Sequence, residues 1–248
     1  MLNRLTAPLA LSLALALPAT AMDLGKLTDE ERALFRAEVR AYLLEHPQVI
    51  MEAVDQLQRR EAEAQAQADV MLVTNNAAEI FDDGYSFVGG NPEGDITLVE
   101  FLDYRCGYCK RAFGEVETLL ETDGNIRLIV KEFPILGEES VLASRFAVAT
   151  KQVAGGEAYK ALHDALMTFN GTVSLTSLRR LAEGLEIDAD AVEARMGSEE
   201  VTEEITRTRA LAEKLGISGT PTFVMQDELL RGYVPLDQMR ALVEDKRG

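Results

Sequence analysis

The two cysteines of this 248-residue chain, Cys106 and Cys109, lie within four residues of each other. A β-type apolar run, Ile96–Leu102, precedes the pair, and a helical pattern follows it. Cys106 is therefore expected at a helix N-terminus, where unpaired N–H groups and the helix dipole stabilise a thiolate. Because Cys109 would lie on the same helical face, it can reach the Cys106 sulfur. We predict thiol–disulfide exchange, with Cys106 as the nucleophile and Cys109 as the resolving thiol.

Other functions of a CxxC pair are less well supported by this sequence. A zinc site needs two further ligands, and the chain offers only His46 and His163, each predicted to be an ordinary helix-end or surface residue. A structural disulfide that closes so short a loop contributes only about 2 kcal/mol on the loop-entropy model. Paired soft thiolates also suit Cu(I), so copper binding by Cys106 and Cys109 stays an alternative; otherwise we predict no metal.

The first residues resemble a cleavable export signal. Arg4 supplies a basic start, an apolar run covers residues 9–17, Pro18 interrupts it, and Ala19-Thr20-Ala21 offers a small-x-small cleavage site. The alternative, a membrane anchor, is disfavoured because the run is too short to cross a bilayer. We predict a signal peptide over residues 1–21, cleavage near Ala21 and a periplasmic location.

Charge and cysteine usage exclude several classes of protein. The chain has 25 basic and 42 acidic residues, a net charge of −17, which disfavours binding to nucleic acid and anionic lipid. A secreted scaffold stabilised by disulfides uses more cysteines, spread further apart. The pair is therefore expected to be reactive, and the Cys106–Cys109 disulfide itself to be the only redox group, without a cofactor.

Two helices are predicted before the cysteine-bearing region. Thr28 and Glu31 form a capping-box pattern at the start of a helix that stops before Pro47. A second helix follows, from about residue 47 into the low seventies. Its apolar positions have heptad-like spacing, which fits self-association or packing on the chain's own domain about equally; the seam comprises Ile50, Val54, Leu57, Ala64, Ala68 and Met71.

The remaining pattern predicts an α/β sheet surrounded by helices. Turn signals over residues 75–91 enclose a short strand at residues 85–88. Residues 138–215 are mostly helical, with breaks near Gly155, Asn170 and Gly184. Further elements are a helix that begins at the cysteines, strands at residues 96–102, 126–133, 222–225 and 228–231, and a final helix at residues 236–245.

Two stretches, residues 99–109 (VEFLDYRCGYC) and 219–222 (GTPT), resemble the DsbA-like branch of the thioredoxin superfamily, and the resemblance extends from about Phe81 to the C-terminus. It implies a thioredoxin fold interrupted by a helical insertion, here at about residues 137–197. The segment from Leu27 to about Ala68, with Tyr42-Leu43-Leu44-Glu45-His46-Pro47, resembles the N-terminal helical region of ScsC-type proteins, some of which trimerise through it. We therefore predict an oligomerisation region at 22–75 and a DsbA-like domain at 76–248.

The resemblance also implies roles for individual residues. Thr220-Pro221 matches the family's cis-proline loop, which offers its backbone to an extended client beside Gly107 and Tyr108. Glu100 matches the family's buried acid beneath the cysteines. An inward carboxyl on a central strand has a raised pKa and can take the proton of Cys109. The alternative for Glu100 is a surface glutamate at a strand edge.

The dipeptide between the cysteines departs from the pattern of strong oxidases, which commonly have His where this chain has Tyr108. Gly107-Tyr108 is similar to the pair of the periplasmic isomerase DsbC. Arg105 either adds positive charge beside Cys106 or is solvated. We expect a disulfide isomerase or reductase of exported proteins, kept reduced by a DsbD-like membrane partner. The alternative is a DsbA-like oxidase served by a DsbB-like partner.

Overall fold

The computed structural model describes residues 24–248, so the predicted signal peptide and its cleavage site lie outside the described residues. The chain divides into two compact units, one that ends at Arg59 and one that spans Arg60–Gly248. Within residues 24–248, no helix is long and apolar enough to cross a bilayer.

The N-terminal unit consists of short helices and the first part of a long one. After a 3-10 turn, η1 (Leu24–Lys26), helix α1 (Asp29–Glu45) begins at the predicted capping box: Glu31 N donates to Thr28 Oγ1, and Thr28 N donates to Glu31 Oε2. Helix α2 (Gln48–Asn75) then begins directly after Pro47. No residue of α1 is buried, although the two helices carry many large apolar side chains. Those exposed in this unit are Leu34, Phe35, Val39, Tyr42, Leu44, Ile50, Met51, Val54 and Leu57.

The C-terminal half of α2 belongs to the second unit. Val73 is buried in that unit's core, and the Asp69 carboxylate pairs with Arg231 at the end of the last strand. This differs from our boundary between residues 75 and 76. The physical reason is that Leu72, Val73 and the Asp69 carboxylate contact the domain, which the heptad-like spacing alone did not indicate.

A five-stranded sheet forms the centre of the second unit, in the order β1-β3-β2-β4-β5. Strands β2 and β3 are parallel, and the other pairs are antiparallel. The strands are β1 (Phe87–Gly90), β2 (Ile96–Leu102), β3 (Ile126–Glu132), β4 (Thr222–Met225) and β5 (Glu228–Arg231). Only the first differs appreciably from its prediction, because Asp83 Oδ1 accepts hydrogen bonds from the backbone N–H of Tyr85 and Ser86 and holds them in a turn.

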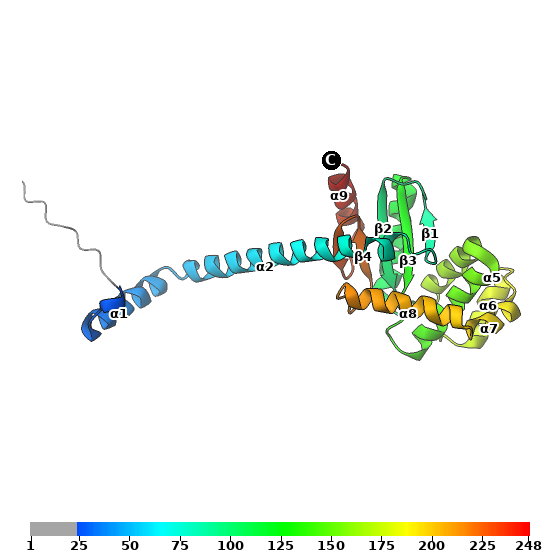
Figure 1. The fold of residues 1–248 in the computed structure, drawn as a ribbon, viewed down its shortest axis with the longest axis horizontal. Helices are drawn as coiled ribbons and strands as arrows, with labels where there is room; N and C mark the ends of the chain where they lie inside the picture. The colour runs from blue at the N-terminus through cyan, green and yellow to red at the C-terminus, as the bar shows by residue number, and fades with distance from the viewer. Residues whose placement is uncertain (1–23) are drawn as a thin grey trace, which may run out of the picture. The chain divides into compact units, whose positions relative to one another are not determined.

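Helices cover both faces of the sheet, which places its central strands in a dry environment (Figure 1). Helices α4 (Gly107–Asp123) and α9 (Leu236–Arg247) pack on one face, and α3 (Ala77–Phe81) and α8 (Glu199–Lys214) on the other. Alternate residues of β2 divide between the two cores: Leu98 and Leu102 join the α4 side, and Val99 and Phe101 join the α8 side.

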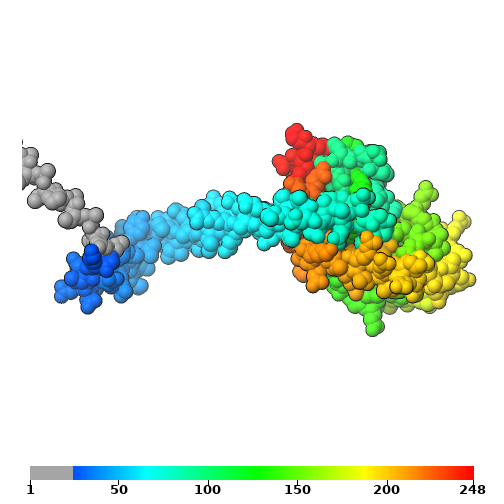
Figure 2. All heavy atoms as spheres, viewed as in Figure 1, coloured from blue at the N-terminus to red at the C-terminus, as the bar shows by residue number. Residues whose placement is uncertain are grey.

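The helical insertion lies between β3 and β4, as predicted. It contains α5 (Glu138–Thr168), α6 (Leu175–Gly184) and α7 (Ala189–Met196), and α8 follows it. Gly155 interrupts α5 with φ of 86°, at one of the predicted breaks. The break between α7 and α8 at Gly197-Ser198 was missed; there the Ser198 hydroxyl accepts a hydrogen bond from Val201 N and caps α8. Helix α8, in orange, runs along the surface of this unit (Figure 2).

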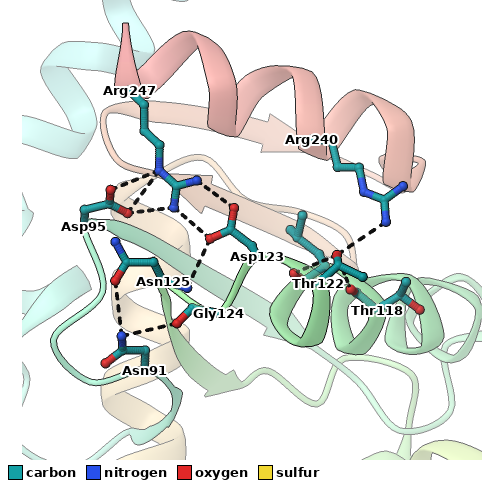
Figure 3. Close-up of polar contacts among 10 residues, drawn as sticks. Asn91, Asp95, Thr118, Thr122, Asp123, Gly124, Asn125, Arg240 and Arg247 are labelled. Carbon is teal, nitrogen blue, oxygen red and sulfur yellow. Dashed lines mark hydrogen bonds and ion pairs between the residues drawn. The ribbon is translucent and has the colours of Figure 1, made fainter.

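The last turn of the C-terminal helix is held by the ion pairs of Arg247. Arg247 donates to Asp95, before β2, and to Asp123, at the end of α4 (Figure 3). Asn91 Nδ2 donates to Gly124 O in the adjoining loop. The contacts between Arg247 and Asp123 fasten α9 to the helix that carries the cysteines.

Candidate active site

Helix α4 begins at the cysteine pair because Cys106 is its N-cap. The Cys106 backbone is extended (φ −76°, ψ 116°), and its carbonyl accepts the first helical hydrogen bond, from Lys110 N at 3.1 Å. Cys109 lies one turn later. Cys106 is 7% exposed and Cys109 is fully buried, so an incoming disulfide can reach only the first sulfur.

The loop before Cys106 is held by Asp103, a residue that the sequence analysis missed. Its buried carboxylate accepts hydrogen bonds from Arg105 N at 2.7 Å, Ile135 N at 2.8 Å and Leu136 N at 3.0 Å. Its carbonyl accepts one from Cys106 N at 3.0 Å. Asp103 therefore joins the end of β2 to the loop after β3 and fixes where the nucleophile stands.

The two thiols have opposite acidities. The hydrogen bond from Cys109 to the Cys106 sulfur lowers the pKa of Cys106 to about 5, aided by Thr220 and by the backbone N–H groups of Cys109 and Tyr108. The same hydrogen bond, burial and the nearby Glu100 charge raise the pKa of Cys109 well above its usual range. The thiol at the helix end is therefore the more acidic of the two, and the thiol one turn inside is the less acidic.

The loop before β4 lies directly against the nucleophile. The Thr220–Pro221 peptide bond is cis, as predicted, and Thr220 O lies 3.1 Å from Cys106 Sγ. Thr222 Oγ1 donates to Gly219 O at 2.8 Å and tightens the turn, and Pro221 is buried. The structure thus brings together Cys106 and the Thr220-Pro221 pair, which lie 114 residues apart in the sequence. Their role in client binding stays a prediction.

Glu100 points into the protein beneath the cysteines, not to the surface. It is 3% exposed on central strand β2, whose side chains alternate so that Glu100 shares the α4 face with Leu98 and Leu102. Burial, then the charges of Glu117, Cys106 and Glu132, raise the pKa of Glu100 to about 8. Its Oε1 has no hydrogen-bond partner among the described residues. In its ionised form, a buried carboxylate beside a thiol is chemically suited to accept a proton; this role of Glu100 stays a prediction.

The residues around the nucleophile differ in exposure. Tyr108 is 62% exposed, and its ring lies 6.2 Å from that of Tyr233. Gly107 is exposed, and a Cβ there would meet no atom within 4 Å. Arg105 forms an ion pair of 2.9 Å with Glu139, so its charge is already compensated at the surface.

Of the two histidine predictions, one is confirmed and one is wrong. His46 is the C-cap of α1, an ordinary helix-end residue as expected. His163 was wrongly expected at a helix end or on the surface: it is buried among aromatic rings, and its Nδ1 lies 3.1 Å from the Tyr104 hydroxyl. The reason is that α5 is packed between the sheet and the other insertion helices at this point. Within residues 24–248, no group of three or more His, Cys, Asp or Glu side chains is arranged to hold a metal ion.

A buried polar cluster next to the cysteines was also missed. Glu132 Oε1 accepts hydrogen bonds from Tyr104 Oη at 2.7 Å and Tyr159 Oη at 2.6 Å. The signal was available in the sequence, because Ile126, Leu128 and Val130 alternate inward along β3 and Glu132 continues their phase.

Comparisons with known proteins agree with this geometry. A family model described as "DSBA-like thioredoxin domain" matches residues 97–244. A second, described as "Copper resistance protein ScsC N-terminal domain", matches residues 31–64. Both resemblances drawn from the sequence are confirmed.

Individual relatives extend the same likeness. A thioredoxin-like oxidoreductase of Silicibacter pomeroyi is 43% identical over 68% of this chain and 96% of its own, with a TM-score of 0.65. ScsC of Proteus mirabilis is 27% identical over 89% of this chain and 98% of its own, also with a TM-score of 0.65. The Na(+)/H(+) antiporter NhaA 3 of Salinispora tropica is 28% identical over 63% of this chain, which spans only 24% of that protein's length.

Proposed function

Because the chain belongs to the DsbA-like thioredoxin family of thiol–disulfide oxidoreductases, we propose that it rearranges or reduces disulfides in exported, cysteine-containing proteins. The observation that carries this proposal is the barely exposed Cys106 sulfur at the start of α4, whose anion is stabilised by the hydrogen bond from Cys109 and by the backbone N–H groups of Cys109 and Tyr108.

The reaction proceeds by two exchanges. The Cys106 thiolate attacks one sulfur of a client disulfide, forms a mixed disulfide and releases the other client sulfur as a thiolate. A different client thiolate then attacks the client sulfur of the mixed disulfide, which forms a new client disulfide and restores reduced Cys106; this is isomerisation, whereas attack by the thiolate just released only re-forms the original disulfide. Alternatively Cys109 loses its proton, attacks Cys106 and releases a reduced client, which leaves the Cys106–Cys109 disulfide. No cofactor beyond this pair takes part.

Two features favour isomerisation over oxidation. The neutral Tyr108 phenol cannot stabilise the thiolate as an imidazolium would, and Gly107-Tyr108 is similar to the pair of DsbC. The second feature is the exposed apolar surface of α1 and of the first half of α2. Association through that surface would place several Cys106 sites around one misfolded client.

The compartment and redox partner follow from the same proposal. Isomerisation needs the dithiol form, so a membrane reductant of the DsbD type is expected to supply electrons in the periplasm. The DsbA-like oxidase alternative requires instead a DsbB-like partner that withdraws them. Copper binding by the same two thiols stays a prediction.

Ribonuclease refolding separates isomerase from oxidase. We expect the reduced protein to restore activity to scrambled-disulfide ribonuclease at least about tenfold faster than the same concentration of glutathione, because Cys106 is a thiolate at neutral pH. The oxidised protein should be a weaker catalyst on reduced ribonuclease. Activity confined to the reduced substrate would instead identify an oxidase.

The oligomer is tested by light scattering on matched chains. We expect the mature chain to be larger than a monomer and a chain that begins at residue 60 to be monomeric. The truncation keeps Asp69 and Val73, which pack on the catalytic unit, and removes only the exposed apolar helices. A monomeric mature chain would contradict the proposal that several Cys106 sites assemble around one client.

A further inference from the structure

A second buried carboxyl, Glu132, lies on the same face of the sheet as Glu100. In the parallel pairing of β2 and β3, Glu100 is opposite Val130 and Leu102 is opposite Glu132, so the two acids are diagonal neighbours. Both are almost completely buried, on the side that holds Cys109. The exchange reaction described above does not use Glu132.

Glu132 is held as an acceptor by two hydroxyl groups. Its Oε1 receives the hydrogen bonds of Tyr104 and Tyr159, and its Oε2 has no hydrogen-bond partner in the part of the chain that the structure describes. Tyr104 lies two residues before Cys106, and Tyr159 lies on α5. The carboxyl thus connects the nucleophile's loop with the helical insertion.

Two hydroxyl groups donate to the same oxygen of Glu132. Tyr159 Oη and Tyr104 Oη each have a single proton, and they lie 2.6 and 2.7 Å from Glu132 Oε1. Burial lowers the pKa of His163 to about 3, so its ring is neutral, and the direction of the 3.1 Å contact between His163 Nδ1 and Tyr104 Oη depends on the tautomer of that ring. The two tyrosine donors favour the carboxylate form of Glu132, because their hydrogen bonds lower its pKa.

We propose that Glu132 is a positioning residue for the thiol chemistry: its carboxylate, held by Tyr104 and Tyr159, makes Glu100 a stronger base toward Cys109. This inference rests on the proposed function. In the step concerned, the Cys109 S–H bond breaks, the proton bonds to a Glu100 carboxylate oxygen and the electron pair stays on sulfur. The new thiolate attacks Cys106 Sγ in the mixed disulfide and expels the client thiolate. Glu132 itself exchanges no proton with the thiols.

The electrostatics of the two carboxyls support this role. Burial raises the pKa of Glu132 to about 7 and that of Glu100 to about 8, and the Glu132 charge is one of the causes that raise the pKa of Glu100. The tyrosine hydrogen bonds lower the pKa of Glu132 and so favour the ionised form that acts on Glu100. The titratable and charged groups that face the two acids are Cys106, Cys109 and Glu117 on or at the start of α4, Tyr104 after β2, and Lys151, Tyr159 and His163 on α5.

Glu117 raises the pKa of Glu100 more than Glu132 does, but it is a different kind of neighbour. Its side chain is 27% exposed and forms an ion pair of 3.0 Å with Lys160. Salt screens an exposed charge and leaves a buried one largely unaffected. The two contributions to Glu100 are therefore separable by ionic strength.

The test combines a titration with kinetics. The Glu100 side-chain carboxyl is followed by ¹³C NMR against pH in the reduced full mature chain, and the closure of the Cys106–glutathione mixed disulfide by Cys109 is timed over the same range. For Glu132→Gln we expect both midpoints to fall by about one pH unit, unchanged in 0.5 M NaCl. Glu132→Asp keeps the charge and is expected to keep both midpoints near wild type. The shift caused by Glu117→Gln is expected to shrink in salt.

Each result decides. The proposal is overturned if Glu132→Gln leaves the Glu100 titration unchanged, if Glu132→Asp shifts it equally, or if the titration moves and the closure profile does not. Should Glu132→Gln not fold, Tyr159→Phe, which removes one donor to the carboxylate, is expected to shift both midpoints in the same direction by less. A wild-type protein without exchange activity would refute the proposed function, while the NMR titration would still report whether the carboxyls are coupled.

Discussion

Replacement of Cys106 by serine is expected to lower the rate of thiol–disulfide exchange at least about 10³-fold, because a serine hydroxyl is not ionised at neutral pH and cannot attack a disulfide. Cys109→Ser is the matched control. It keeps the nucleophile and should accumulate a mixed disulfide with the client, visible by mass spectrometry. Equal loss in both variants, without a trapped intermediate, would contradict the assigned order of attack.

The same sulfur should show its acidity directly. With a pKa of about 5, Cys106 is a thiolate from pH 6 upward, so its alkylation by iodoacetamide should be nearly constant between pH 6 and 8 and fall about fivefold from pH 5 to 4. Cys109 is buried and should remain unlabelled. A rate that climbs steadily through pH 7 to 9, as for a peptide thiol, would remove the basis of the mechanism.

Local signals in the sequence were sufficient to predict most elements that position this site. The β-type apolar run at residues 96–102 predicts β2, and the two adjacent short runs at residues 222–225 and 228–231 predict β4 and β5. The Thr28 capping box predicts the start of α1. In each case the determining interactions lie within a few residues of one another. The position of Thr220 against Cys106 came instead from family resemblance, because nothing local relates residues so distant in sequence.

The missed features all depend on tertiary packing. His163 and Tyr159 become buried only when α5 folds back on the sheet, and Asp103 acquires its partners only when the loop after β3 lies beside it. Residues 60–75 have the spacing of an exposed helix, yet Val73 is buried in the core of the second unit. A single sequence shows which residue types occur and with what spacing, but it does not show which distant segment packs against them.

Glu100→Gln is expected to stabilise the reduced protein at alkaline pH, although it should slow closure by Cys109. The pKa of Glu100 is about 8 in the folded protein and about 4.5 when unfolded, so the folded state holds a proton that the unfolded state has lost. Wild-type stability should therefore fall as pH rises from 4.5 to 8, and Gln cannot titrate. Between pH 4 and pH 8 the free energy of unfolding of the variant should rise by about 4 kcal/mol relative to that of the wild type, or roughly 8–16 °C in Tm.

Because Gln adds an amide N–H₂ group to a buried position, its fixed cost has to be separated from the electrostatic gain. Thermal unfolding of wild type and Glu100→Gln at several pH values does this, since the fixed cost is independent of pH and the gain is not. Glu121→Gln, an exposed substitution on α4, controls for the general loss of a negative charge. A Tm difference that stays constant from pH 4 to 9 would show that Glu100 is ionised in the fold at neutral pH. Glu100 would then lack the raised pKa on which its role as the base for Cys109 depends.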